Sequence, residues 1–273
     1  MTAQTLSTRR VEKPWGRTQL WPAFDDPAPG APPIGEIWFE GEGDPDLLVK
    51  YLFTSEKLSV QVHPDDEAAR ARGHARGKDE AWVILAAEPD STIALGTLAP
   101  MTRDELAMAA RDGSIEALLD WKPVKAGDVF YSPAGTVHAI GAGITLVEVQ
   151  QNVDLTYRLY DYGRPRELHL EDGVAVADPV PFTAPGAPAE PDADGRALLA
   201  QGPKFVLERW TGGARRLNLP AGTPGWLIPL AGSGHADGTP WAAGECLMLS
   251  GACEIVADAG ADLLVAYPGT TRF

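Results

Sequence analysis

The chain has 273 residues, of which 44% are hydrophobic and 22% charged, so it is long and apolar enough for one large or two small globular domains. Its 38 acidic and 23 basic residues give a net charge of −15, which argues against a surface that binds nucleic acid or anionic membranes. No apolar run approaches the length of a membrane span, and residues 1–10 lack the apolar segment of a signal peptide. We therefore expect a cytoplasmic protein in which Cys246 and Cys253 are buried and reduced.

Short β-strands separated by turns are the main pattern in the first hundred residues. A loop is expected at 27–33, where four of the seven residues are proline. Residues 64–78 predict a short helix, because Asp65 or Asp66 can cap its start. Apolar runs bounded by turns predict strands at 34–39, 47–53, 58–63, 80–85 and 92–96.

A clear helical signal follows these strands. The sequence Thr102-Arg103-Asp104-Glu105 has the form of a capping box, in which the first and last residues bond reciprocally to the first turn. One or two short helices should follow, with an apolar stripe that packs against the core; the stripe consists of Leu106, Ala109, Ala110, Ile115, Leu118 and Leu119. Strands resume at 129–132, 144–150 and 156–160.

The last third of the chain predicts a second β unit. Residues 178–203 are rich in proline, alanine, glycine and aspartate, which is typical of a linker. We predict a metal-binding catalytic domain at 1–180 with a helical insert at about 102–120, a linker at 181–203, and a smaller β domain at 204–273. Many short strands with few helices favour β-sandwiches or barrels. Strands in the smaller domain are expected at 205–210, 225–230, 245–249 and 263–267.

One predicted strand has an unusual polar face. Within residues 58–64, apolar residues starting at Leu58 alternate with polar ones, so the side chains of Ser59, Gln61 and His63 share one side of the strand. An imidazole two residues after an amide can aim at the same point as that amide. The pattern raises the question of which other segments bring ligands there.

A second stretch, Gly127–His138, resembles a signature of the cupin β-barrels. It has the form Gly, five residues, Pro-x-Gly, two residues, His, and every defined position is matched. Gly127 allows a tight turn into a strand, and Pro133 and Gly135 bend the chain before His138. The resemblance implies that His138 points into the interior of a barrel.

The other cupin signature normally supplies two histidines and a glutamate. Here Gln61-Val62-His63 stands in place of the two histidines, and Glu80 follows 17 residues after His63. With residues 77–82 and 150–161, these motifs closely resemble the type I mannose-6-phosphate isomerases, in order and with matching spacing from about residue 11 to residue 172. The resemblance implies a mainly β chain with a cupin-type β-barrel (jelly roll), in the compact bacterial form that lacks a large helical domain.

The resemblance implies a zinc site. Gln61, His63, Glu80 and His138 match the four zinc ligands of the family, which predicts one Zn²⁺ per chain with a further position open. Taken singly, each histidine is more often a packed core residue, and Glu80 could be a solvent-facing strand residue. Two histidines that each lie inside a matching motif reverse those odds.

The resemblance also assigns residues to the interconversion of mannose 6-phosphate and fructose 6-phosphate. A proton leaves C2 and returns at C1 through an enediol, which requires an acid/base and a positive charge near the developing oxyanion. Lys78 matches an active-site lysine of the family, Arg158 matches its catalytic arginine, and Glu148 matches an inward-facing acid. We expect Lys78 and Arg158 to stabilise the developing charge. Lys50 and Ser59 match positions associated with phosphate recognition. The base could be Glu148 or a metal-bound water acting with it.

Several alternatives stay open. Arg158 could form a structural ion pair with Asp154 or Asp161, and Glu148 could be either exposed or in the mouth of the barrel. The expected partner is a phosphosugar, with no nucleic acid and no membrane, and the chain could be a monomer or a homodimer. The remaining histidines carry no motif and are expected at the surface; they are His74, His169 and His235.

Two other functions compete with the isomerase. The first is a different metal-dependent cupin enzyme, such as a dioxygenase or an epimerase, although Gln61 argues against the histidine-rich iron site of a dioxygenase. The second is a non-catalytic cupin that binds sugar phosphates. The presence of Lys78, Glu148 and Arg158 beside the expected ligands argues against a loss of activity.

Overall fold

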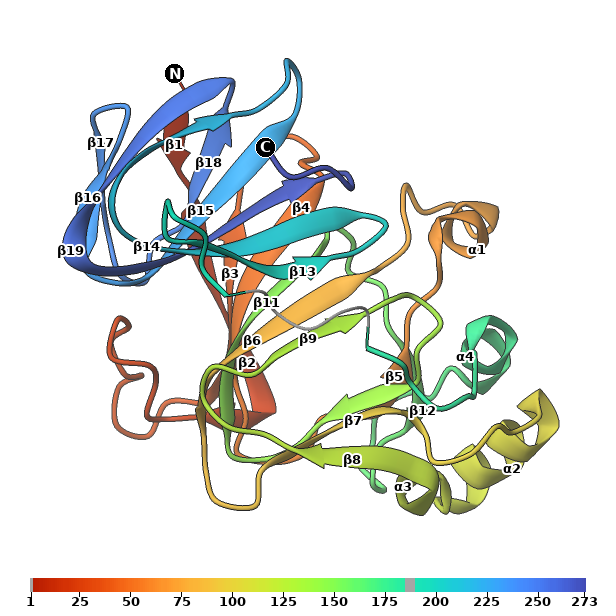
Figure 1. Cartoon of the computed structure of the whole chain (residues 1–273). Coiled ribbons are helices and arrows are strands. Elements are labelled where there is room, and N and C mark those ends of the chain that lie inside the picture. Colours follow the sequence, from red (N-terminus) through yellow and green to blue (C-terminus); the bar gives the residue numbers. More distant parts are fainter. Residues whose placement is uncertain (1, 185–189) are drawn as a thin grey trace.

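Alternating apolar and polar residues place nearly half of the chain in antiparallel β-strands, which form three sheets (Figure 1). The computed structural model describes residues 2–184 and 190–273. Short helices lie at one end of the molecule, at the right of Figure 1; they are α1 (Asp66–Ala71), α2 (Arg103–Asp112), α3 (Ile115–Leu118) and α4 (Leu170–Val176). The prediction of a mainly β chain with a short helical segment is confirmed.

The sheets are built from segments far apart in the sequence. The five-stranded sheet has the order β12 (Tyr157–Tyr160), β5 (Val60–Val62), β10 (His138–Ile140), β7 (Thr92–Thr97), β8 (Leu119–Pro123). The six-stranded sheet has the order β2 (Ser7–Arg17), β3 (Ile34–Glu40), β4 (Leu47–Phe53), β11 (Ile144–Gln151), β6 (Glu80–Ala87), β9 (Val129–Ser132). The eight-stranded sheet follows β1 (Ala3–Thr5), β18 (Leu247–Ser250), β15 (Pro224–Ala231), β19 (Ala252–Pro268), β14 (Phe205–Asn218), β13 (Arg196–Gln201), with the hairpin β16 (Ser233–Ala236) and β17 (Thr239–Ala242) beside β19.

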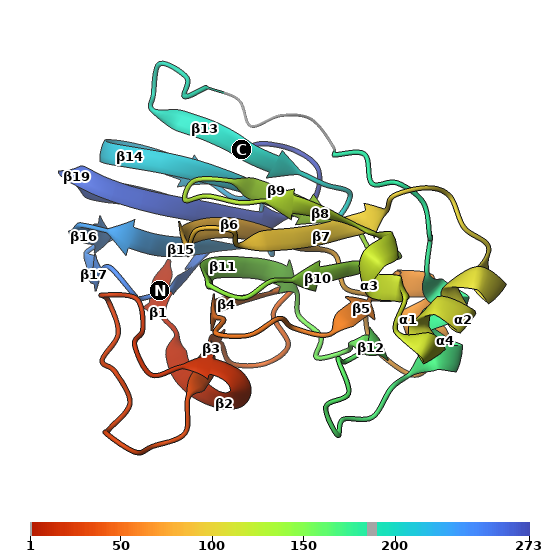
Figure 2. The same cartoon turned by 90° about the horizontal axis from the view of Figure 1, so that it is seen from below.

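The six-stranded sheet is the middle layer of the molecule (Figure 2). Tyr51, Val147 and Val83 are paired across β4, β11 and β6, so they lie on one face, and they pack against Trp226 and Leu264 of the eight-stranded sheet. The opposite face packs against the five-stranded sheet through a second apolar cluster. Because both faces are covered, polar residues on the second face are enclosed between two sheets.

The contact between the outer and middle sheets supports a stability prediction. Trp226 is 1% exposed and belongs to the cluster that joins these two sheets. Replacing it with alanine should lower the free energy of unfolding by about 3–5 kcal/mol, because the cavity left behind cannot close fully. Urea unfolding measures the change, with Leu98→Ala as the control, since Leu98 is 62% exposed. Equal effects of the two substitutions would contradict this assignment of the core.

Several predicted elements differ from those in the structure. The helix expected at 64–78 covers only Asp66–Ala71; Asp65 caps it, and Gly73 ends it with a φ of 86°. The strand expected at 58–63 is confined to Val60–Val62. Leu58 therefore leaves the expected apolar face and joins the cluster between the five- and six-stranded sheets.

The domain boundaries stay a prediction. Two observations bear on them: strand β13 lies inside the stretch expected to be a linker, and β1 from the N-terminus pairs with β18 of the C-terminal unit. Part of the predicted linker, residues 185–189, lies outside the described residues. We use "C-terminal unit" below for residues 196–273.

Candidate active site

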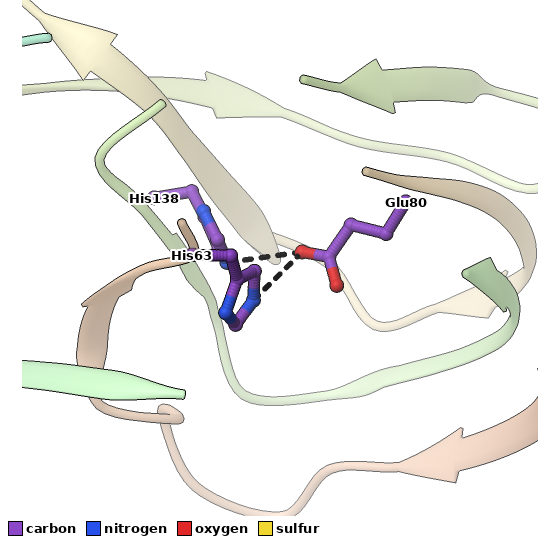
Figure 3. Close-up of side chains that lie close together, drawn as sticks. All are labelled: His63, Glu80 and His138. Atoms are coloured by element: carbon purple, nitrogen blue, oxygen red, sulfur yellow. Dashed lines mark ion pairs between the residues drawn. The ribbon is translucent and has the colours of Figure 1, made fainter. Parts of the chain in front are cut away.

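Three buried side chains meet between the five- and six-stranded sheets (Figure 3). His63 follows β5, Glu80 begins β6 and His138 begins β10. Glu80 Oε1 lies 3.0 Å from Nε2 of His138 and 3.4 Å from Nε2 of His63, and the two imidazole rings are 4.9 Å apart. Each residue offers one possible metal-ligand atom, and these three atoms lie within 4.8 Å of one another, which is close enough for all three to bind one ion.

Strand register places further predicted residues beside this cluster. On β5, Gln61 is directly opposite His138 of β10 on one side and opposite Arg158 of β12 on the other. Paired residues of adjacent strands project to the same face, so these three side chains share the inner face of the five-stranded sheet. The Oε1 atom of Gln61 accepts a hydrogen bond of 3.4 Å from Ser59.

The cluster consists of hydrogen-bond acceptors that face one another. The Nδ1 of His138 donates to the carbonyl of Thr136 at 2.9 Å, which leaves a lone pair on Nε2. The Lys78 ammonium can only donate, so at 3.2 Å it makes Nε2 of His63 an acceptor too. Neither oxygen of Glu80 accepts a hydrogen bond of ordinary geometry, although Lys78 Nζ lies 3.0 Å from Oε2. Two nitrogen lone pairs and a buried carboxylate form a set of metal ligands that suits a divalent cation.

Burial and charge keep the cluster in the protonation state that binds metals. Burial, together with the neighbouring Lys78 ammonium, lowers the pKa of His63 to about 3, so its imidazole is neutral. Burial opposes ionisation of Glu80, but its neighbours, Lys78 first among them, together outweigh burial and hold the pKa of Glu80 well below its usual value. Burial also disfavours the ammonium of Lys78, yet Glu80 and Glu148 raise its pKa.

A pocket of about 470 Å³ adjoins the cluster. Lys78 and Gln61 belong both to its wall and to the surroundings of the three clustered side chains. All the residues predicted to act on the substrate line it; they are Lys50, Ser59, Lys78, Glu148 and Arg158. The structure thus brings the predicted site residues to one place, while their individual roles stay predictions.

One wall of the pocket is a row across the six-stranded sheet. Glu148 pairs with Lys50 of β4 and with Trp82 of β6, and Lys50 pairs in turn with Trp38 of β3. Glu148 accepts from Trp82 Nε1 at 3.1 Å and lies 3.4 Å from Lys50 Nζ, which also stacks on Trp38 at 4.1 Å. Burial lowers the pKa of Lys50, although Glu148 opposes the shift. Of the two open alternatives for Glu148, the structure excludes an exposed side chain.

Arg158 is free of the ion pairs considered for it. Asp161 is occupied by Arg164 and Arg166, the latter with two bonds of 2.6 Å. The Nε of Arg158 donates to the carbonyl of Glu167 at 3.0 Å, and the side chain lines the pocket. Burial, and then Arg166, lower the pKa of Arg158. A guanidinium stays charged in proteins, so the side chain is a cation in the pocket wall.

The expectation that His169 lies at the surface is wrong. His169 is half-buried and lines the pocket, where its Nδ1 accepts from the backbone N–H of Arg158 at 3.2 Å. The residue has no motif of its own, and only the pairing of its segment with β12 reveals its position. Other pocket residues missed by sequence reasoning are Lys13, Trp15, Glu36, Trp38, Asp154 and Arg166.

The chain is similar to known mannose-6-phosphate isomerases. No model of a known protein family matches it. It is 46% identical over 161 residues to the mannose-6-phosphate isomerase ManA of Bacillus subtilis, covering 53% of this chain and 50% of that protein. It is 39% identical over 172 residues to the mannose-6-phosphate isomerase of Streptococcus mutans, covering 60% and 54%. The chain spans about half the length of these curated relatives.

A solved structure extends the likeness over nearly the whole chain. The crystal structure of the mannose 6-phosphate isomerase from Bacillus subtilis matches with a TM-score of 0.84 at 26% identity, over 97% of this chain and 99% of that one. The expected mainly β, cupin-like fold and the resemblance indicated by the motifs are therefore confirmed. In the described residues the strands form three layered sheets, and no closed barrel is seen.

Proposed function

We propose that this chain is a metal-dependent isomerase that interconverts mannose 6-phosphate and fructose 6-phosphate. The observation that carries the proposal is the buried acceptor cluster of His63, Glu80 and His138, which adjoins a pocket lined by cationic side chains. The named relatives, which carry this activity in their names, support the choice of substrate.

The metal would be held by His63, Glu80 and His138, with the amide oxygen of Gln61 as a fourth ligand. Two imidazoles, one carboxylate and one amide leave a divalent ion with a net positive charge, so Zn²⁺ suits the set. Bound there, the ion would polarise a sugar oxygen or a water molecule. We propose one Zn²⁺ per chain.

The chain's own residues would bind the sugar phosphate and move the proton. Trp82 and Lys50 hold Glu148, so its carboxylate has a defined orientation in the pocket wall. A group that takes a proton from C2 and returns it at C1 needs such a fixed orientation. Lys78 and Arg158 supply positive charge that would stabilise the enediol oxygen. Lys50 and Ser59 also line the pocket, and we keep substrate binding as their proposed role.

The expected partner is therefore a small phosphosugar. In the part of the chain that the structure describes, no helix is long and apolar enough to cross a membrane. We propose a cytoplasmic enzyme, as a monomer or a homodimer.

Removing the metal tests the proposal directly. Purified chain should convert mannose 6-phosphate to fructose 6-phosphate, and dialysis against a chelator should abolish this activity, because the ion that would polarise the sugar oxygen is then lost. Added Zn²⁺ should restore turnover. A coupled assay for fructose 6-phosphate measures the rate, with a mock-dialysed sample as the control. Binding of the sugar phosphate without turnover at saturating Zn²⁺ would instead favour a non-catalytic cupin.

A further inference from the structure

The two ends of one loop carry metal-binding side chains. Residues 64–79, here called the ligand loop, run from His63 to Glu80. The two ends of the loop meet, and the N–H of Lys78 donates to the carbonyl of Pro64 at 3.0 Å. This meeting point of the two ends is here called the neck of the loop. Gly77 sits in the same crossing, where a Cβ atom would lie 2.4 Å from the carbonyl carbon of Asp65. Closing this neck brings His63 and Glu80 together.

Asp66 is the acid that ties the neck. One oxygen accepts from the N–H of Gly77 at 2.8 Å and from the amide of Gln151 at 3.0 Å. Partial burial opposes ionisation of Asp66, but hydrogen bonds from Lys204 and these groups outweigh it and lower its pKa. Gln151 is therefore held from the loop side, at the end of β11.

Asp79 connects the ligand loop to the segment before His138. Its backbone is bracketed by Gln151, which accepts from the N–H of Asp79 at 3.0 Å and donates its own N–H to the Asp79 carbonyl at 3.0 Å. The buried carboxylate accepts from the N–H of Ala134 at 3.1 Å and from the hydroxyl of Tyr131 at 2.6 Å. The N–H of Gly135 donates to the carbonyl of His63 at 2.8 Å. The segments that carry His63, Glu80 and His138 are thus linked to one another.

The C-terminal unit reaches both acids from a single turn. Residues 202–204, here called the β13–β14 turn, are followed by Phe205, the first residue of β14. Strand β13 lies beside β9 (Figure 2). Lys204 Nζ lies 2.8 Å from the second oxygen of Asp66. The ring of Tyr131 packs on Phe205 at 5.2 Å, and a Cβ atom on Gly202 would lie 1.9 Å from that ring. One contact ends on Asp66 and the other, through Tyr131, on Asp79.

We infer that the β13–β14 turn of the C-terminal unit positions the metal-binding side chains, with Lys204 and Tyr131 as positioning residues. The inference rests on the metal centre of the proposed function. It assigns to the C-terminal unit the role of positioning the ligands of that centre. Lys204 holds the neck of the ligand loop through Asp66, and Tyr131 holds the residue next to Glu80. If these contacts only stabilised the fold, losing them would lower the unfolding temperature but leave the affinity of the folded chain for a metal unchanged.

The test measures metal affinity in the full chain without any sugar. Lys204→Met removes the charge and keeps the length of the side chain. Because Lys204 acts through Asp66 and not on a ligand directly, the variant should raise the dissociation constant for Zn²⁺, measured by chelator competition, by up to about tenfold, the lower end of what losing a direct partner of a metal ligand costs. Lys204→Arg should restore the affinity. Lys122→Met is the matched control, because Lys122 also pairs with an aspartate and its side chain is 33% exposed, against 30% for Lys204.

Tyr131→Phe is a second variant that keeps the ring on Phe205 and removes the hydrogen bond to Asp79. It should also weaken Zn²⁺ binding and shift the visible absorption of bound Co²⁺, while Lys122→Met should do neither. Wild-type affinity and an unchanged Co²⁺ spectrum in both Lys204→Met and Tyr131→Phe would overturn the inference, as would an equal loss in the control. A wild-type chain that binds no Zn²⁺ would overturn the metal centre and the inference together, whereas one that binds Zn²⁺ but does not isomerise would overturn the proposed function alone.

Discussion

Replacing His138 with alanine is expected to remove metal and activity together while the fold persists. His138 is 1% exposed, and its Nε2 faces Glu80. Loss of a residue that hydrogen-bonds a metal ligand typically lowers metal affinity or activity by roughly 10–100-fold. His138 is a proposed ligand itself, so its loss should cost more than that. Metal content by mass spectrometry and turnover in the coupled assay give the two readouts.

The control for this substitution is His235→Ala, because His235 is exposed and lies in the C-terminal unit. It should leave both metal content and turnover unchanged. Circular dichroism should show the same β-rich spectrum for both variants, since one hydrogen bond to Thr136 is a small part of the sheet structure. Wild-type turnover in a His138→Ala protein without metal would show that the site is assigned wrongly.

Replacing Arg158 with alanine should leave the metal bound and reduce turnover by about 10²–10³-fold, the usual cost of removing a group that stabilises a developing oxyanion. The guanidinium lines the pocket, and its one assigned hydrogen bond uses Nε. Lysine at this position should not restore turnover, because an ammonium lacks the planar fork of donors that a guanidinium offers. Steady-state kinetics at saturating Zn²⁺ measure the effect.

Arg164→Ala serves as the matched control for Arg158→Ala. Arg164 bonds to Asp161 and to the carbonyl of Lys57, and it is not among the residues that line the pocket. Its loss should affect stability rather than turnover. Unchanged turnover in Arg158→Ala, or a loss of metal equal to that in His138→Ala, would rule out the proposed role of Arg158.

Local patterns carried much of the fold prediction because they depend on near neighbours in the chain. The capping box at Thr102 and Glu105 forms as expected at the start of α2, since both partners lie within one helical turn. Most strands appear where apolar residues alternate or cluster. The helix after β5 is shorter than expected, because Gly73 ends it in the left-handed region and the chain then returns to cross its own start at Gly77. The crossing is a contact between two ends of a loop, which no local pattern shows.

The sequence by itself determined the mainly β class, the resemblance to the isomerases and the candidate residues His63, Glu80 and His138, because each of these lies inside a short motif. The tertiary structure alone decided which groups meet across the sheets. It placed His169 in the pocket and Lys204 on Asp66, although these partners are separated from the motifs by loops and whole strands. Such contacts depend on sheet register and on the packing of one layer against the next, which are properties of the assembled chain.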